Sequence, residues 1–111
     1  ETALVYFGGE ASHAFRKGPL LRLDSALVEG LFAPEEITAR QPGADERALA
    51  AAAYAAIPFE TPLYARIDMI SDDKGAPVLL ELEMTEPSVY FRHAAGSADR
   101  LARLLLARCN G

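Results

Sequence analysis

Two stretches in the second half of the chain alternate between polar and apolar residues, and this pattern predicts a pair of β-strands. Residues 62–70 and 77–84 flank a short polar segment with Gly75, which is typical of a hairpin loop. Side chains on a strand point alternately to its two faces. Arg66 and Asp68 should therefore share one face of the first strand.

The register of this hairpin follows from its loop. If Asp72 lies opposite Pro77, the pairs along the two strands are Arg66 with Glu83, Ile67 with Leu82, Asp68 with Glu81, and Met69 with Leu80. We expect the four charged residues of these pairs to project from one face and the four apolar residues to be buried beneath the other. Neighbouring carboxylates repel each other, and a hard divalent cation would remove that repulsion. A charged face exposed to solvent is the ordinary alternative for an antiparallel sheet.

The beginning of the chain predicts a second hairpin. Residues 2–7 and 11–17 form two apolar-rich runs, and Gly8-Gly9 between them suits a two-residue turn that requires positive φ. The expected register pairs Tyr6 with Ala11 and Val5 with Ser12. Residues 20–43 have no clear pattern, and the segment 35–40 fits either a short strand or a helical turn.

Two helices are expected. An alanine-rich run over residues 45–56 has high helix propensity, with Asp45 as the expected N-cap and Pro58 as the stop. A last helix is expected from Ser97 to Arg108, with a leucine stripe on one face. Paired strands with separate helices indicate an α+β fold, an antiparallel sheet built from two hairpins with two helices packed on one side.

Composition narrows the classes of function. The 111 residues suit one domain, and half of them are hydrophobic. A net charge of −5 argues against nucleic acid or an anionic membrane as the main partner. No apolar run is long enough to span a bilayer. Cys109 is the only cysteine, so a reducing, cytoplasmic setting is the default expectation.

The second hairpin resembles the C-terminal catalytic half of ATP-grasp carboxylate–amine ligases. In that superfamily an Arg-x-Asp strand pairs with a Glu-x-Asn strand, and the chain has Arg66-Ile67-Asp68 and Glu81-Leu82-Glu83. The segment that begins Glu86-Pro87-Ser88 is similar to a branch with the D-cycloserine-forming ligase and glutathione-synthetase-like proteins. Glu83 stands where the family usually has Asn.

The resemblance implies a role for each matching residue. Asp68 and Glu81 would hold Mg²⁺, Glu83 could join them, and Arg66 would stabilise charge on the transferred phosphoryl group. Arg16 or Lys17, at the end of the first hairpin, would face phosphate or substrate. Ser88 could bind phosphate or simply begin a turn. His13, His93 and Arg22 remain without an assigned role, and a structural role is the simpler interpretation of both histidines.

The implied cofactors are ATP and Mg²⁺, and the implied substrates are a small-molecule carboxylate and an amine joined through an acyl phosphate. Such enzymes also need an N-terminal domain and a lid, and we expect neither within residues 1–111. We therefore expect a fragment of a longer protein that is inactive alone. Two alternatives stay open: an ATP-grasp kinase, and a non-catalytic interaction module that kept the fold.

Overall fold

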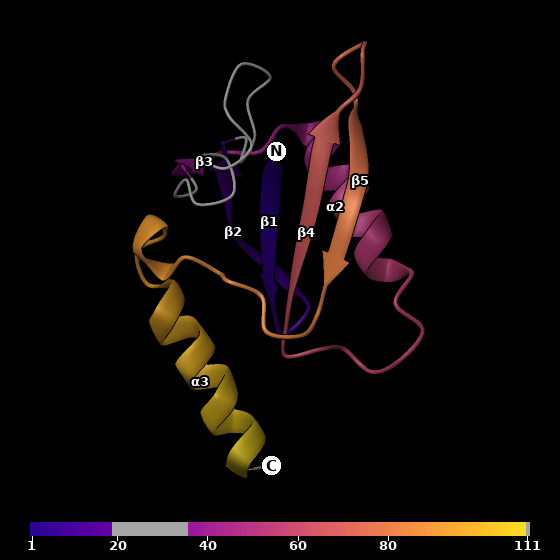
Figure 1. Cartoon of the computed structure of the whole chain (residues 1–111). Helices are drawn as coiled ribbons and strands as arrows, with labels where there is room; N and C mark the ends of the chain where they lie inside the picture. Colours follow the sequence, from indigo (N-terminus) through magenta and orange to yellow (C-terminus); the bar gives the residue numbers. More distant parts are fainter. Residues whose placement is uncertain (19–35, 111) are drawn as a thin grey trace, which may run out of the picture.

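The computed structural model describes residues 1–18 and 36–110. Its centre is a five-stranded antiparallel sheet in the order β3-β2-β1-β4-β5 (Figure 1). The strands are β1 (Thr2–Phe7), β2 (Glu10–Lys17), β3 (Ile37–Arg40), β4 (Tyr64–Ser71) and β5 (Pro77–Glu83). The helices are α2 (Ala44–Ala55), a short 3-10 helix (Phe91–His93) and α3 (Ser97–Asn110). The predicted α+β class, with an antiparallel sheet and two helices, is confirmed.

The first hairpin turns at two glycines with positive φ. Gly8 has a φ of 60° and Gly9 a φ of 91°, a region that residues with a Cβ rarely adopt. Tyr6 pairs with Ala11 as predicted, but Val5 pairs with His13. The predicted partner of Val5, Ser12, is instead the extra residue of a β-bulge, which alternation along the sequence does not reveal.

The second hairpin has the predicted register at its functional end. Arg66 pairs with Glu83, Asp68 with Glu81, and Ile67 with Leu82. A bulge beyond Asp68 then pairs Met69 with Leu79, so the predicted pairing of Met69 with Leu80 is wrong. Leu80, the extra residue of this bulge in the edge strand β5, is 53% exposed instead of buried. Ile67 and Met69 lie in the core as expected.

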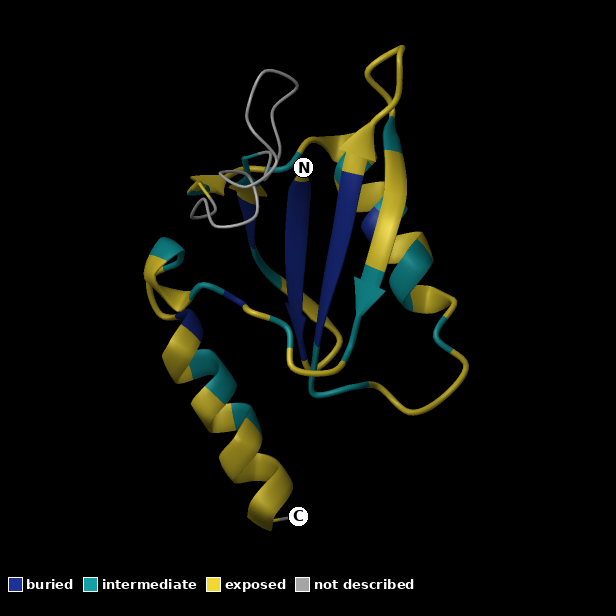
Figure 2. Cartoon of the chain, in the orientation of Figure 1, coloured by how far each residue is buried: buried dark blue, intermediate teal, exposed yellow. Residues whose placement is uncertain are grey.

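Both faces of the sheet are covered, because β1 is apolar on both sides and is buried along its whole length (Figure 2). Leu4, Tyr6 and Ile67 pack with Ala50 of α2 on one face. Val5, Phe7 and Phe15 pack with Val89 and the start of α3 on the other. The two helices therefore contact opposite faces, whereas one side was expected, and α3 runs away from the sheet (Figure 1).

The ends of both helices differ slightly from the prediction. Gly43 is the N-cap of α2, and Asp45 lies one position inside the first turn. The Glu46 Oε1 atom accepts hydrogen bonds from the Gly43 N–H at 2.9 Å and from Arg40 at 2.8 Å. The Ser97 hydroxyl does not cap α3, because it donates to the Ala94 carbonyl at 2.7 Å.

Within the described residues, no helix is long and apolar enough to cross a membrane.

The segment that fitted either a short strand or a helical turn is a strand. Most of residues 36–40 form β3, which pairs with the end of β2. Cys109 is exposed and has a free thiol.

Candidate active site

A buried ion pair forms the centre of the site. The Nε atom of Arg66 donates to Asp68 Oδ1 at 2.9 Å, and its Nη2 atom donates to Asp68 Oδ2 at 2.9 Å. Asp68 is fully buried and Arg66 is 9% exposed. Both residues point to the same face of β4, because they are two positions apart. This bidentate arrangement fixes the plane of the guanidinium group.

Lys17, the last residue of β2, brings a second cation to the same carboxylate. Its Nζ atom lies 3.1 Å from Asp68 Oδ2 and 3.1 Å from Glu1 Oε1. Burial acts to lower the pKa of the Lys17 ammonium group, but the hydrogen bonds to Asp68 and Glu1 outweigh burial and the pKa is raised. Lys17 therefore keeps its positive charge at this position.

Two carboxyl groups lie beside this network on β5. Glu81 and Glu83 are the cross-strand partners of Asp68 and Arg66, and they lie two positions apart on the same face of β5. Hydrogen bonds from the Thr85 N–H at 2.8 Å and hydroxyl at 3.0 Å lower the pKa of Glu83. Two carboxylates this close repel each other unless a proton or a cation lies between them.

The segment after β5 closes the site over Arg66. The Nη1 atom of Arg66 donates to the Ser88 carbonyl at 3.1 Å, so the main chain of Ser88 contacts the site. The Nε2 atom of His13 lies 2.6 Å from the next carbonyl, that of Val89. The Ser88 side chain is exposed, and its hydroxyl has no hydrogen bond to the described residues.

Two other predicted basic residues stand apart. Arg16 follows the opposite parity from Lys17, so it points to the other face of β2 and is exposed. Of the two alternatives at the end of this strand, only Lys17 joins the network. Arg22 lies outside the described residues.

Comparison with known proteins finds relatives that match nearly the whole chain. The chain is 35% identical to the cycloserine biosynthesis protein DcsG of Streptomyces lavendulae, over 97% of this chain and 37% of that protein. It superposes on the crystal structure of D-cycloserine synthetase DcsG with a TM-score of 0.78 and 32% identity, covering 96% of this chain and 37% of that one. No protein-family model matches the chain.

More distant solved structures share the fold alone. The ATP-grasp ligase PsnB, complexed with a minimal precursor, matches with a TM-score of 0.59 and 15% identity, over 95% of this chain and 36% of that one. The D-alanine–D-alanine ligase of Bacillus anthracis matches with a TM-score of 0.62 and 17% identity, over 96% of this chain and 38% of that one. The same ligase has also been solved in complex with ATP.

The chain has the fold of an ATP-grasp ligase. The resemblance that the Arg-x-Asp and Glu-x-Glu strands suggested is therefore confirmed. The chain spans 37% of the length of DcsG. The comparison therefore shows the fold of this part and not the activity of a whole ligase.

An ATP-grasp ligase would hold Mg²⁺ at this hairpin, and the residues fit that ion in part. Among the described residues, no group of three or more His, Cys, Asp or Glu side chains is arranged to hold a metal. Both oxygens of Asp68 already accept hydrogen bonds from Arg66 or Lys17. Glu81 and Glu83 are the more accessible carboxylates, and a Mg²⁺ ion that keeps several waters needs only one or two.

Sequence patterns missed two contacts of the network. Glu1 pairs with Lys17, but a terminal residue beside a strand carries no distinctive pattern. The contact from His13 to Val89 joins residues that are 76 positions apart, and no local signal reports it. Strand parity could have separated Arg16 from Lys17, because it places Lys17 on the face of Phe15.

Proposed function

We propose that this chain is the Mg-ATP-binding catalytic part of an ATP-dependent carboxylate–amine ligase that acts through an acyl phosphate. One observation carries the proposal: the buried Arg66 and the half-buried Lys17 converge on Asp68 directly across from Glu81. Positive charge beside a cluster of carboxylates suits a reaction in which phosphate is transferred between negatively charged groups.

In the proposed reaction, an oxygen of the substrate carboxylate attacks the γ-phosphorus of ATP. The bond to the bridging oxygen breaks, and ADP leaves with that oxygen. The amine then attacks the acyl carbon and expels inorganic phosphate, and the amine nitrogen loses a proton. Binding and alignment supply most of the catalysis in such steps.

Arg66 is the residue that we assign to the transferred phosphoryl group. Asp68 fixes its guanidinium group from one side, and the Ser88 carbonyl accepts a hydrogen bond from Nη1. The orientation is thus set before substrate binds, so little reorganisation is needed during the reaction. The main chain of Ser88 positions Arg66, and its free hydroxyl is the remaining candidate contact to phosphate.

Lys17 is the proposed phosphate ligand at the end of β2. It is already charged and shares one oxygen of Asp68 with Arg66, so a phosphate group could take the place of Glu1 as its second partner. Arg16 faces the other way and has no part in this proposal.

Glu81 and Glu83 are the proposed primary ligands of Mg²⁺, and Asp68 would join them when Lys17 turns towards phosphate. Bound Mg²⁺ would neutralise negative charge on the phosphates. Glu83 adds a carboxylate where the family usually has Asn, so this site offers one more negative charge to the ion.

The substrates are proposed as a small carboxylate and an amine. We also propose that residues 1–111 act as one domain of a longer protein that contributes an N-terminal domain and a lid. This proposal rests on the share of DcsG that the chain matches.

The test is turnover by that longer protein with Glu81→Gln. We expect ADP release to fall to background while the unfolding midpoint stays unchanged, because Glu81 is exposed and its replacement leaves no cavity. Glu60→Gln is the control, since it removes an equally exposed carboxylate outside the site. Near-normal turnover, or failure to fold, would show that the ligand assignment is wrong.

A further inference from the structure

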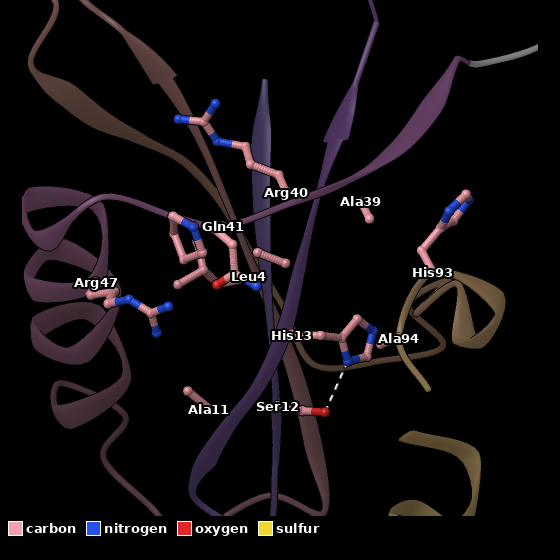
Figure 3. Close-up of a pocket in the computed structure, with 12 residues that line it drawn as sticks. Leu4, Ala11, Ser12, His13, Ala39, Arg40, Gln41, Arg47, His93 and Ala94 are labelled. Atoms are coloured by element: carbon pink, nitrogen blue, oxygen red, sulfur yellow. Dashed lines mark hydrogen bonds between the residues drawn. The ribbon is translucent and has the colours of Figure 1, made fainter. Parts of the chain in front are cut away.

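A cavity lies at the edge of β2, away from the Asp68 network (Figure 3). Its volume is about 380 Å³, within the usual size of small-molecule sites. Polar side chains from four segments line it: Ser12, His13, Arg40, Gln41, Arg47 and His93. We name it the β2-edge cleft.

The cleft exists because β3 is short. β3 pairs only with residues 14–17 of β2, so no described strand lies beside the outer edge of residues 10–13. The bulge at Ser12 lies in this uncovered stretch and re-aims the side chains beside it. Arg47 reaches towards the strands from α2, and His93 borders the opposite end (Figure 3).

The charge of the cleft contrasts with the charge of the whole chain. The net charge is −5, yet the lining includes two arginines, two histidines and no Asp or Glu. The Nη2 atom of Arg40 donates a hydrogen bond to Glu46 Oε1 at 2.8 Å. The other N–H groups of this guanidinium remain available to a ligand. The N–H of Arg47 donates to the Gly43 carbonyl within α2, but its guanidinium group has no hydrogen bond or ion pair with the part of the chain that the structure describes.

The cleft is also organised before any ligand binds. The Ser12 hydroxyl lies 2.8 Å from His13 Nδ1, and His13 Nε2 lies 2.6 Å from the Val89 carbonyl. The carbonyl can only accept, so Nε2 carries a proton and donates to it. The imidazole is therefore held at both of its nitrogens. His93 Nε2 is buried nearby without a hydrogen-bond partner among the described residues.

We propose that the β2-edge cleft binds a small organic or inorganic anion through the guanidinium group of Arg47, with Arg40 and the amide of Gln41 at its rim. Carboxylate and phosphate groups share the planar, bidentate recognition that arginine provides. The cleft does not include Arg66, Lys17, Glu81 or Glu83, so this site is separate from the proposed ligase chemistry.

The test is an NMR titration of this chain with two probes, inorganic phosphate and malonate, at constant ionic strength set with chloride. We expect saturable shifts of the Ser12, His13 and Gln41 amides with at least one probe. Tighter binding of phosphate or of malonate would identify which kind of anion the cleft prefers.

Three variants separate a built site from general charge attraction. Arg47→Gln should weaken binding about tenfold, because hydrogen bonds between charged groups are the strong ones, and Arg40→Gln should weaken it less. Arg103→Gln, which removes the same charge from α3, should leave affinity unchanged. Absence of saturation with both probes, or equal effects of Arg47→Gln and Arg103→Gln, would overturn the proposal.

Discussion

Asp68 is the charge on which the buried network depends. It is fully buried and balances two cations, Arg66 and Lys17, of which one hydrogen-bonds to both of its oxygens. Removing one partner of a buried pair leaves an uncompensated charge in a medium that solvates it poorly. The network should therefore contribute strongly to folding as well as to the proposed chemistry.

We expect Asp68→Asn to lower the free energy of unfolding by about 3–5 kcal/mol, measured by urea denaturation. Asp73→Asn is the matched control, because Asp73 is exposed in the hairpin loop, and its effect should stay within about 0.5 kcal/mol. Equal losses in the two variants would contradict the role given to the buried pair.

His13 should make stability depend on pH. Burial lowers its pKa from the ordinary value of 6.5, and Arg100 and His93 act in the same direction against the hydrogen bond to Val89. The unfolded chain then binds a proton more readily than the folded chain, so stability is greatest above pH 6.5 and falls as the pH drops below it.

The check is urea denaturation between pH 7.5 and 5.5 on the parent chain and on His13→Asn. We expect the parent chain to lose more stability over this range, because the variant lacks the titrating group. The same pH dependence in both proteins would show that His13 is not responsible.

Among single residues, strand parity predicted that Arg66, Asp68, Glu81 and Glu83 share a face, since the period of two is a local property. Parity could not predict that Lys17 and Glu1 complete the network. Their contacts join β2 and the chain start to β4, and they depend on the order of strands in the sheet.

The second hairpin shows how a single bulge changes which residues form the core. Leu80 is the extra residue opposite the step from Asp68 to Met69, and it is 53% exposed. Beyond it every pair is shifted by one position, so Pro77 lies opposite Ser71 and the expected pairing of Pro77 with Asp72 is wrong. Bulges often occur next to functional sites, where they re-aim a side chain or end the pairing. This one lies directly beside the pair of Asp68 with Glu81.

We expect Leu80→Ala to change the free energy of unfolding by about 0.5 kcal/mol or less, because Leu80 is 53% exposed. Leu4→Ala removes the same side chain from a site that is 2% exposed, and it should cost about 2–5 kcal/mol. The measurement is thermal or urea unfolding. A comparable loss for Leu80→Ala would support the register without a bulge, in which Leu80 is buried opposite Met69.

Elements with strong local signals were predictable, and their arrangement was not. The glycine turn, the alanine-rich helix and the leucine-bearing last helix all depend on propensities within a few residues. The short β3 was ambiguous, because a four-residue strand is defined by its partner, β2. The helices cover opposite faces because β1 is apolar on both, a pattern that fits a buried central strand.

The chain matches 37% of the length of DcsG, so we expect the proposed site to be completed by other parts of a longer protein. Ligases of this type must keep water from the activated carboxylate. We expect no ADP release by the isolated chain with ATP, Mg²⁺ and candidate carboxylates and amines, measured with a coupled assay. Turnover at ordinary enzyme rates, about 1 per second or faster, would contradict the proposal that further domains are required.

The most direct test of the central claim is paramagnetic broadening of this chain's amide signals by Mn²⁺, which stands in for Mg²⁺, with and without ATP. We expect the broadening to centre on Glu81 and Glu83, to strengthen with ATP, and to extend to Lys17 when nucleotide is present. It should disappear in the Glu81→Gln, Glu83→Gln double variant and persist in Glu60→Gln. Broadening centred on Asp72 and Asp73, or unchanged in the double variant, would contradict a metal-phosphate site on the β4–β5 hairpin.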